Sequence, residues 1–410
     1  MHNIEQSEGY IRALALVDAC STPDGFVAST TDRDNYKRIW ARDGVIIGLA
    51  ALLTGEERYQ KTLHATLKTL REHQGPHGEI PSNVDTASGR VSLGGTTGRV
   101  DADLWYIIGC AAYWRATSDD RFLEEFYASI ERVQFLLGCW EFNNRGLIYV
   151  PQTGDWTDEY LHQGYVLYDQ LLYWRALQDL CDMEKARHGK EDQILRDKVD
   201  RLHSLIRKNY WFFSCEKDAP GTYHPVLHQK GCEAAVHCNT HWMAFFSPTG
   251  YGYRFDALAN TLVSLFGIAD DDQRERVDSF IAKEVVQQDM MVLPAFHPII
   301  HPEDDAWNEL EVSFSFTFKN RPYEFQNGGL WPFVTGFYVA DLAKRGKTDL
   351  ARQYVDGIDK ANKLGTDGEE WGFYEYIHGK YHSPGGTRNQ GWSAAASLIG
   401  HHALDGTFIF

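Results

Sequence analysis

Residues 104–114 read LWYIIGCAAYW, a segment that is apolar on most faces of a helix. A helix of this kind is buried among other elements rather than lying on a surface. Two further stretches share this property, VIIGLAALL at 45–53 and LWPFVTGFYVADL at 330–342. The three segments predict helices in the interior, and such helices need others to cover them.

Amphipathic helical patterns alternate with these buried segments along the chain. In residues 59–70 the apolar side chains recur at spacings of 4, 4 and 3, which is one face of a helix. The same pattern covers 122–137, 195–205 and 277–285. No Pro- or Ser-rich linker separates the helices, so we expect residues 1–410 to form a single all-α domain. Two concentric rings of helices, a toroid, satisfy the alternation most simply.

Long polar connections rich in glycine and aromatic residues interrupt the helical pattern. They cover 74–100, 143–165, 214–254 and 364–391. Loops of this length inside a compact domain are usually functional, so we expect them to gather at one end of the toroid. Short β-like patterns, such as Val312 to Phe318, predict hairpins among them.

Composition excludes several classes of partner. The net charge is −17, and this argues against nucleic acid and anionic membranes, which both require basic surfaces. The longest apolar stretches are far shorter than the roughly 20 residues that span a bilayer. Seven cysteines, an odd and scattered set, predict reduced thiols rather than a disulfide framework, and hence a cytoplasmic protein. A small carbohydrate fits this chain as a partner, and the sequence leaves room for a homo-oligomer.

Two loops carry carboxylates in aromatic surroundings. The stretch QTGDWTDEY at 152–160 places Asp155, Asp158 and Glu159 around Trp156. In the loop at 364–391, Glu375 lies between two tyrosines. A carboxylate that aromatic rings partly desolvate has a shifted pKa, which suits acid–base chemistry. Asp158 and Glu375 therefore form a candidate pair, with the layout of an inverting glycosidase.

Polar side chains also stand beside an indole at the start of three predicted buried helices. The segments are IWARDG at 39–44, RVDADLWY at 99–106 and FQNGGLWP at 325–332. Sugar sites combine planar polar groups for hydroxyls with aromatic faces for C–H surfaces. The candidate binding residues from these segments are Trp40, Arg42, Asp43, Asp101, Gln326, Asn327 and Trp331.

From about 250 to 402 the chain resembles the neutral/alkaline invertase family of glycoside hydrolases. The matching segments, in order, are YGYRFDALANTLVSLFG, MVLPAFHP, QNGGLWPFVTGFYVADLAKRG, YEYIHGK and NQGWSAA. The N-terminal half is similar through YKRIWARDG, GRVDADLWY and YDQLLYWRAL, and glucoamylases and debranching glucosidases share the WARDG-like pattern. The resemblance implies an (α/α)6 barrel that hydrolyses a glycosidic bond with inversion and without a metal or organic cofactor.

The resemblance also implies roles for individual residues. Glu375 matches the family's general base without a gap. Asp158 matches the general acid with a one-residue gap, which leaves Asp155 as a rival. Asp158 would be kept protonated by the neighbouring indole of Trp156. The positions that match the glucosyl subsite are Arg42, Asp43, Asp101, Gln326, Asn327, Gln390 and Trp392. Sucrose is the first choice of substrate, and an α-glucosidase acting on glucose–glucose links or glucosylglycerate-like compounds is the alternative.

Four other interpretations are open. Cys232, His237, Cys238 and His241 could suggest zinc, but their spacing matches no common zinc pattern. A sugar 2-epimerase on the same toroid would use histidines, and His378 and His382 lie near Glu375 in the sequence. A phosphorylase would need a phosphate cradle, for which Arg388 and Lys380 are candidates. A non-catalytic sugar-binding protein would keep the aromatic cleft and lack the acid.

Overall fold

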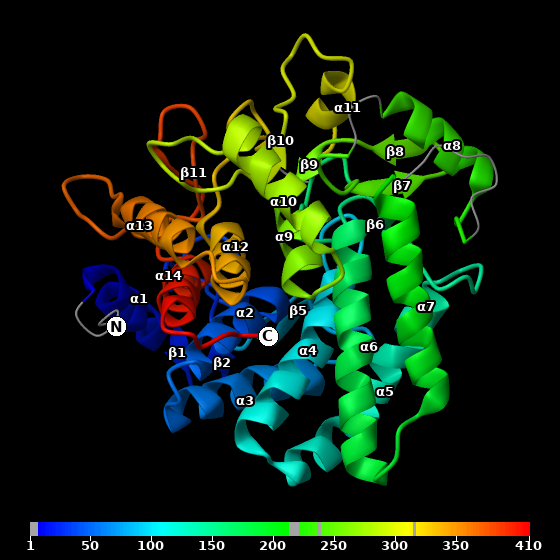
Figure 1. The fold of residues 1–410 in the computed structure, drawn as a ribbon. Coiled ribbons are helices and arrows are strands. Elements are labelled where there is room, and N and C mark those ends of the chain that lie inside the picture. Colours follow the sequence, from blue (N-terminus) through cyan, green and yellow to red (C-terminus); the bar gives the residue numbers. More distant parts are fainter. Residues whose placement is uncertain (1–6, 213–220, 236–238, 315–316) are drawn as a thin grey trace.

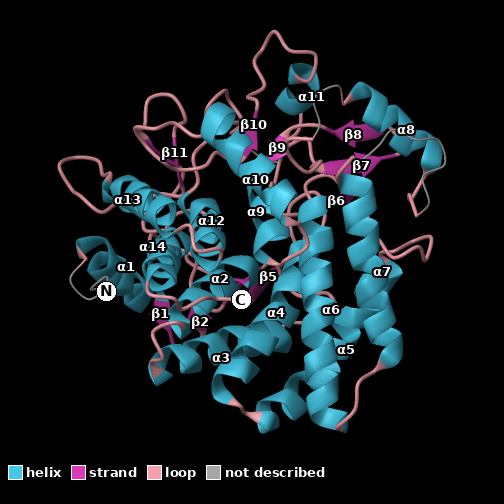
Figure 2. Ribbon diagram, in the orientation of Figure 1, coloured by secondary structure: helices cyan, strands magenta, loops and turns pink. Residues whose placement is uncertain are grey.

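The computed structural model describes residues 7–212, 221–235, 239–314 and 317–410. Helices dominate it, and strands are short (Figure 2). Six mostly buried helices of the described chain form an inner ring in which each contacts the next and the last closes on the first. They are α2 (Ala41–Leu52), α4 (Val100–Thr117), α6 (Leu167–His188), α9 (Ala257–Leu265), α12 (Pro332–Lys344) and α14 (Gly391–Leu404).

Six amphipathic helices lie outside this ring. They are α1 (Glu8–Cys20), α3 (Glu57–Glu72), α5 (Asp120–Cys139), α7 (Gln193–Tyr210), α10 (Asp271–Phe280) and α13 (Thr348–Lys363). Each of them contacts an inner helix, α10 through hydrogen bonds to α9 and α12. Helix α1 packs beside α14 although the two come from opposite ends of the chain (Figure 1). The alternation of buried and amphipathic segments therefore folds as an (α/α)6 barrel, as the sequence predicts.

Local signals in the sequence fix where these helices begin. The Asp119 side chain accepts hydrogen bonds from two backbone N–H groups at the start of α5. Asp270 and Gln273 form a reciprocal capping box at the start of α10. After α10 the chain continues as a short π-helical segment, η2 (Ile281–Val285).

The connections carry small antiparallel sheets and two short helices, α8 (Pro225–Ala234) and α11 (Trp307–Glu311). β3 pairs β4 with Ile39 opposite Val84, and β6 pairs β7 with Tyr165 opposite Phe246. The strands are β1 (Ser21–Thr22), β2 (Gly25–Phe26), β3 (Ile39–Trp40), β4 (Asn83–Asp85), β5 (Arg90–Ser92), β6 (Tyr165–Val166), β7 (Phe245–Ser247), β8 (Gly250–Gly252), β9 (Phe255–Asp256), β10 (Phe296–His297), β11 (Tyr376–Ile377) and β12 (Pro384–Gly385).

Two details of the connections differ from the sequence prediction. The hairpin expected over Val312 to Phe318 is wrong for the described residues there, because Val312 is a turn after α11 and no strand follows. A further long connection, 286–331, joins η2 to α12 and holds β10 and α11. Its aromatic and polar residues follow no helical period, and the predicted loops do not include it.

The cysteines only partly follow the prediction of reduced thiols. Cys20, Cys110, Cys139 and Cys181 are free. Cys232 is disulfide-bonded, so the prediction is wrong at this position. Cys215 and Cys238 lie outside the described residues. No helix in the described part of the chain is long and apolar enough to span a membrane.

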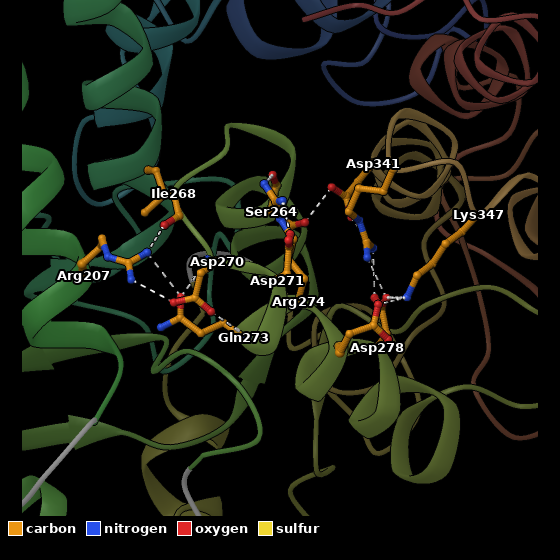
Figure 3. Close-up of polar contacts among 12 residues, drawn as sticks. Arg207, Ser264, Ile268, Asp270, Asp271, Gln273, Arg274, Asp278, Asp341 and Lys347 are labelled. Atoms are coloured by element: carbon orange, nitrogen blue, oxygen red, sulfur yellow. Dashed lines mark hydrogen bonds and ion pairs between the residues drawn. The ribbon is translucent and has the colours of Figure 1, made fainter.

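A polar network ties α10 to its neighbours (Figure 3). Arg207 of α7 donates to Asp270 at 3.0 Å, and Ser264 of α9 donates to Asp341 of α12 at 2.6 Å. Asp278 of α10 accepts from Arg345 at 2.8 Å and from Lys347 at 2.7 Å. Charged contacts therefore join α10 to α7 and to the turn between α12 and α13, and the Ser264–Asp341 hydrogen bond joins α9 to α12.

We expect Asp278→Ala to lower the free energy of unfolding at pH 7 by about 1–3 kcal/mol, because it removes the half-buried carboxylate that Arg345 and Lys347 share. Both cations keep one further partner, Asp341 for Arg345 and Glu275 for Lys347. Burial would raise the pKa of Asp278, but Arg345 and Lys347 lower it below the ordinary value of 3.8. The stabilisation is therefore complete above pH 3.8 and is lost as the pH falls through the depressed folded pKa. Urea denaturation measures it. Asp272→Ala, which breaks an exposed pair with Arg276, is the control and should change little.

Candidate active site

A cavity of ≈ 670 Å³ opens where the inner helices α2, α4, α12 and α14 begin. Residues at or beside these four N-termini line it, together with residues of the long loops. We call it the cleft. Its described lining is Asp34, Asn35, Tyr36, Arg38, Trp40, Arg42, Asp43, Ser82, Asn83, Ser92, Gly94, Gly95, Thr96, Arg99, Trp156, Asp158, Glu159, Thr317, Lys319, Trp331, Glu375 and Trp392. Asp158 and Glu375, the carboxylates predicted as a pair, both line this cleft.

Glu375 is a buried member of the cleft lining, 5% exposed. The Tyr36 hydroxyl donates to both carboxylate oxygens, at 2.9 and 3.1 Å, and the backbone N–H of Thr387 donates to Oε2 at 3.2 Å. Burial raises the pKa of Glu375 to about 7, although the charge of Lys319 and these hydrogen bonds act to lower it. The carboxyl is therefore held in one orientation and titrates near neutral pH.

Asp158 comes to the same cleft from another loop, at residues 152–163, which we call the acid loop. Arg99 Nη2 lies 2.6 Å from Asp158 Oδ1. The same guanidinium donates to the backbone oxygens of Thr153 and Asp155, so Arg99 clamps the acid loop to the start of α4. Asp158 has φ of 51°, a left-handed conformation that aspartate tolerates better than most residues. The neighbour at 2.6 Å is thus a cation, and not the indole of Trp156 that the sequence suggested.

Asp155, the rival of Asp158, does not line the cleft. Its carboxylate accepts from the Thr157 backbone N–H at 2.8 Å and contacts His162 Nδ1 at 2.9 Å. Burial acts to raise the pKa of Asp155, but His162 and Thr157 lower it below its ordinary value. His162 Nε2 lies 3.7 Å from Asp256 Oδ2, so the imidazole sits between two buried carboxylates. Asp155 is placed to hold the acid loop together.

Arg42 and Asp43 present their side chains to the cleft from the first turn of α2. Arg42 Nη1 donates to Asp101 Oδ2 at 2.8 Å, and its guanidinium lies 5.7 Å from the centre of the Trp392 ring. Burial raises the pKa of Asp43 to about 6 against the opposing effect of Arg42. Asp101 itself lies outside the cleft lining and orients Arg42.

Of the predicted binding residues, the tryptophans line the cleft and the side-chain amides do not. Trp40, Trp156, Trp331 and Trp392 line it. Gln326 and Asn327 are fully buried outside the lining, where Asn327 binds the backbone of Ile300 and Gln326 donates to Trp156 O at 3.3 Å. Gln390 precedes α14, also buried, and its side-chain amide has no hydrogen-bond partner among the described atoms.

The structure also bears on the epimerase, phosphorylase and zinc interpretations of the sequence. No histidine is among the described residues that line the cleft, and His378 instead stacks on Tyr323. Arg388 pairs with Glu369, away from the cleft lining. For zinc, His237 and Cys238 lie outside the described residues. Within the described chain no group of three or more histidine, cysteine or acidic side chains is placed to hold a metal ion.

Sequence reasoning missed three groups that act on the two carboxyls. Tyr36 and Arg99 contact Glu375 and Asp158 directly, and Lys319 affects Glu375 through its charge. Tyr36 and Arg99 each lie in a segment that was singled out for other residues, YKRIWARDG and GRVDADLWY. The only signal in the sequence was that Tyr36 and Arg99 each lie shortly before a helix whose first turn carries an aspartate.

A helical (α/α)6 barrel whose cleft brings Asp158 and Glu375 together with four tryptophans has the features of a glycoside hydrolase. The sequence profile of the alkaline and neutral invertase family matches residues 11–217 and 239–406. The chain belongs to this glycoside hydrolase family.

Individual relatives agree with this assignment. Alkaline/neutral invertase E, chloroplastic, of Arabidopsis thaliana is 24% identical over 97% of this chain and 71% of its own length. Alkaline/neutral invertase C, mitochondrial, of the same plant is 25% identical over 95% of this chain and 65% of its own length. The chain thus spans about two thirds of the length of these relatives.

The solved structures share the fold. A mannosylglycerate hydrolase from Thermus thermophilus, in complex with Tris and D-glycerate, superposes with a TM-score of 0.66 at 13% identity, covering 95% of this chain and 99% of that one. At this identity the likeness establishes the (α/α)6 fold alone.

Proposed function

We propose that this chain hydrolyses a small α-glucoside with inversion, with Asp158 as general acid and Glu375 as general base. The observation that supports it is that both carboxyls, from loops far apart in the sequence, line one aromatic cleft. An inverting mechanism uses two carboxyls roughly 6.5–9.5 Å apart, with a water between one of them and the sugar. Neither role requires a metal or organic cofactor.

Glu375 acts on the water. Its pKa of about 7 lets it be ionised at neutral to mildly alkaline pH while it remains basic enough to take a proton. Tyr36 holds both carboxylate oxygens, which fixes the direction in which the water is activated. The water then attacks the anomeric carbon from the face opposite the leaving group.

Asp158 acts on the leaving group. In its protonated form it donates to the glycosidic oxygen as the bond breaks. Arg99, at 2.6 Å, stabilises the carboxylate that forms once the proton has gone. The proton that Glu375 removes from water is returned through solvent, and Asp158 is recharged for the next turnover.

The glucosyl ring is held by the groups at the start of α2 and α14. In this proposal Arg42 and Asp43 bond its hydroxyls and the indoles of Trp40 and Trp392 cover its C–H faces, which is supported by their presence in the cleft lining. Asp101 contributes indirectly, through its 2.8 Å contact with Arg42. These assignments make glucose the anchored sugar.

Sucrose is the first candidate substrate because the family and the two plant relatives carry the name invertase. An α-glucosidase or glucosylglycerate-type hydrolase is the alternative, because glucoamylases and debranching glucosidases share the WARDG-like pattern of residues 40–44. Residues 156–165, most of which lie in the acid loop, are the candidates for contact with the leaving group. A site that bonds one hydroxyl can reject an analogue that lacks it by a factor of order 10⁴. A cytoplasmic location and a homo-oligomer remain predictions.

A panel of substrates tests the proposal. Purified protein is incubated with sucrose, maltose, isomaltose, trehalose and glucosylglycerate, and released sugars are followed by NMR. We expect fructose and glucose from sucrose at a rate at least equal to that on the other compounds. If another α-glucoside is cleaved and sucrose releases no fructose, the protein is instead an α-glucosidase or a glucosylglycerate-type hydrolase. Intact glycosidic bonds throughout would contradict the hydrolase assignment.

The pH profile follows from Glu375. A general base must be ionised, so kcat/KM is expected to rise as the pH increases through about 7, the pKa to which burial raises this carboxyl. A stopped assay between pH 5 and 9 measures this dependence of kcat/KM on pH. Tyr36→Phe removes a hydrogen bond to the ionised form of Glu375, so the rise of kcat/KM should move to higher pH in this variant. A rate that instead falls through this range would reverse the roles of the two carboxyls.

A further inference from the structure

The acid loop separates the cleft from a second cavity of ≈ 440 Å³. Glu159 lines the cleft, and the next residue, Tyr160, lines the second cavity. The remaining walls come from the β7–β8 hairpin, the segment that follows it, β10 and α11, which extend from the top centre to the upper right of Figure 1. The cleft and the second cavity share no lining residue among those described.

Two polar groups of the second cavity are enclosed without a partner. Tyr160 is 1% exposed, and its hydroxyl has no hydrogen bond among the described atoms. Arg254 likewise has an enclosed Nε without a partner among the described atoms, and it lines the same cavity as Tyr160. Burial raises the pKa of the Tyr160 phenol, and the positive charge of Arg254 opposes this effect. Buried polar groups are nearly always hydrogen-bonded, to protein, water or ligand. An unpartnered phenol and an unpartnered guanidinium nitrogen in the walls of one cavity therefore point to a ligand that binds there.

The chemistry of the walls selects the kind of ligand. Aromatic rings of Tyr251 and Phe296 line the second cavity, and its charged side chains include both Arg254 and the acidic Glu309. The opposed charges disfavour a small anion. Aromatic faces combined with planar polar groups are the chemistry of a carbohydrate site, and the cleft of this same chain combines them in the same way.

We propose that the second cavity is a separate saccharide site that binds a neutral mono- or disaccharide, with Arg254 and Tyr160 as hydrogen-bonding groups. Its volume lies in the range that accommodates small ligands. The binding claim is independent of catalysis. Its consequence for turnover, below, rests on the proposed function.

The acid loop, which is a wall of both cavities, connects the second cavity to the residues that line the cleft. Phe296 stacks on Tyr160 with ring centres 4.4 Å apart, and it also stacks at 6.3 Å on Trp156, which lines the cleft. His162, which also lines the second cavity, contacts Asp155 at 2.9 Å. A sugar seated against Tyr160 and His162 thus touches the loop that carries Asp158, and it should alter kcat rather than compete for the cleft.

Crystals of the Asp158→Asn variant soaked in D-glucose test the binding. We expect sugar density against Arg254 and Tyr160 as well as in the cleft. Arg254→Ala in the same background should remove the density from the second cavity and retain it in the cleft. An NMR titration with D-glucose should show two binding steps, one in the cleft and one in the second cavity. The Kd of the step in the second cavity should rise at least about tenfold in Arg254→Ala. Arg121→Ala, an exposed arginine on α5, is the matched control and should change neither step.

Density in the cleft alone, or a titration that Arg254→Ala leaves unchanged, would overturn the proposal. Binding seen only at the concentration of the soak would also overturn it as a site that functions in solution. For turnover, D-glucose should inhibit the parent enzyme with both a KM and a kcat component, and Arg254→Ala should lose the kcat component only. If no substrate is ever hydrolysed, the soak and the titration still decide whether the second site exists.

Discussion

Glu375→Gln is expected to lower kcat by about 10²- to 10⁴-fold, because it removes the group that takes the proton from the attacking water. Glutamine keeps the shape of the side chain and can still accept from Tyr36, so substrate binding should change little. Single-turnover kinetics with the best substrate of the panel measure the loss, and a binding titration measures the retained affinity. A variant that kept wild-type kcat would remove Glu375 from the mechanism.

The same substitution should stabilise the protein at alkaline pH. Folding raises the pKa of Glu375 from 4.5 to about 7, so the buried carboxylate costs stability once it is ionised, and the cost grows from pH 4.5 until the pH passes 7. Glutamine has no charge to bury. We therefore expect a higher Tm for Glu375→Gln than for the parent at pH 8 and a smaller difference at pH 5. A loss of activity through unfolding would instead lower Tm at both values.

Asp158→Asn is expected to reduce kcat on sucrose or another natural glucoside by a similar factor of about 10² to 10⁴, because no proton reaches the leaving oxygen. The loss should nearly disappear with α-glucosyl fluoride, since fluoride departs without protonation. Glu375→Gln should be slow on both compounds, because the water still needs a base. Rates of the two variants on the two substrates therefore separate the acid from the base.

Asp155→Asn is the matched control, three residues away in the same loop. Its carboxylate contacts Thr157 and His162 and does not line the cleft, so the change should act mainly on stability and on the position of the acid loop. A turnover loss for Asp155→Asn that exceeded that of Asp158→Asn and vanished with the fluoride would make Asp155 the acid.

The ring architecture could be predicted because its signal is local and repeated. Inner helices such as α4 are apolar on most faces, and outer helices such as α3 show a single apolar stripe. The pairing of Tyr36 with Glu375, 339 positions apart, has no such local signal. The long connection at 286–331 could not be predicted for a related reason. Its sequence has no periodic pattern, and its side chains are positioned by contacts with other loops.

The candidate site was predicted where chemistry and position coincide. Trp40, Arg42 and Asp43 stand at the start of a buried helix, and four inner helices begin at the cleft, so their side chains converge. Gln326 and Asn327 have the same sequence signature, but the chain turns them toward the backbone of other loops. Sequence spacing places a residue near a helix start, and it does not say which way the side chain points.

The configuration of the first sugar released is the most direct test of the proposed mechanism. Proton NMR in the first minutes of hydrolysis distinguishes the two anomers of glucose before they interconvert. An inverting pair formed by Asp158 and Glu375 predicts that an α-linked substrate releases β-glucose first. Initial release of α-glucose would mean retention, and would contradict a mechanism in which Glu375 activates a water.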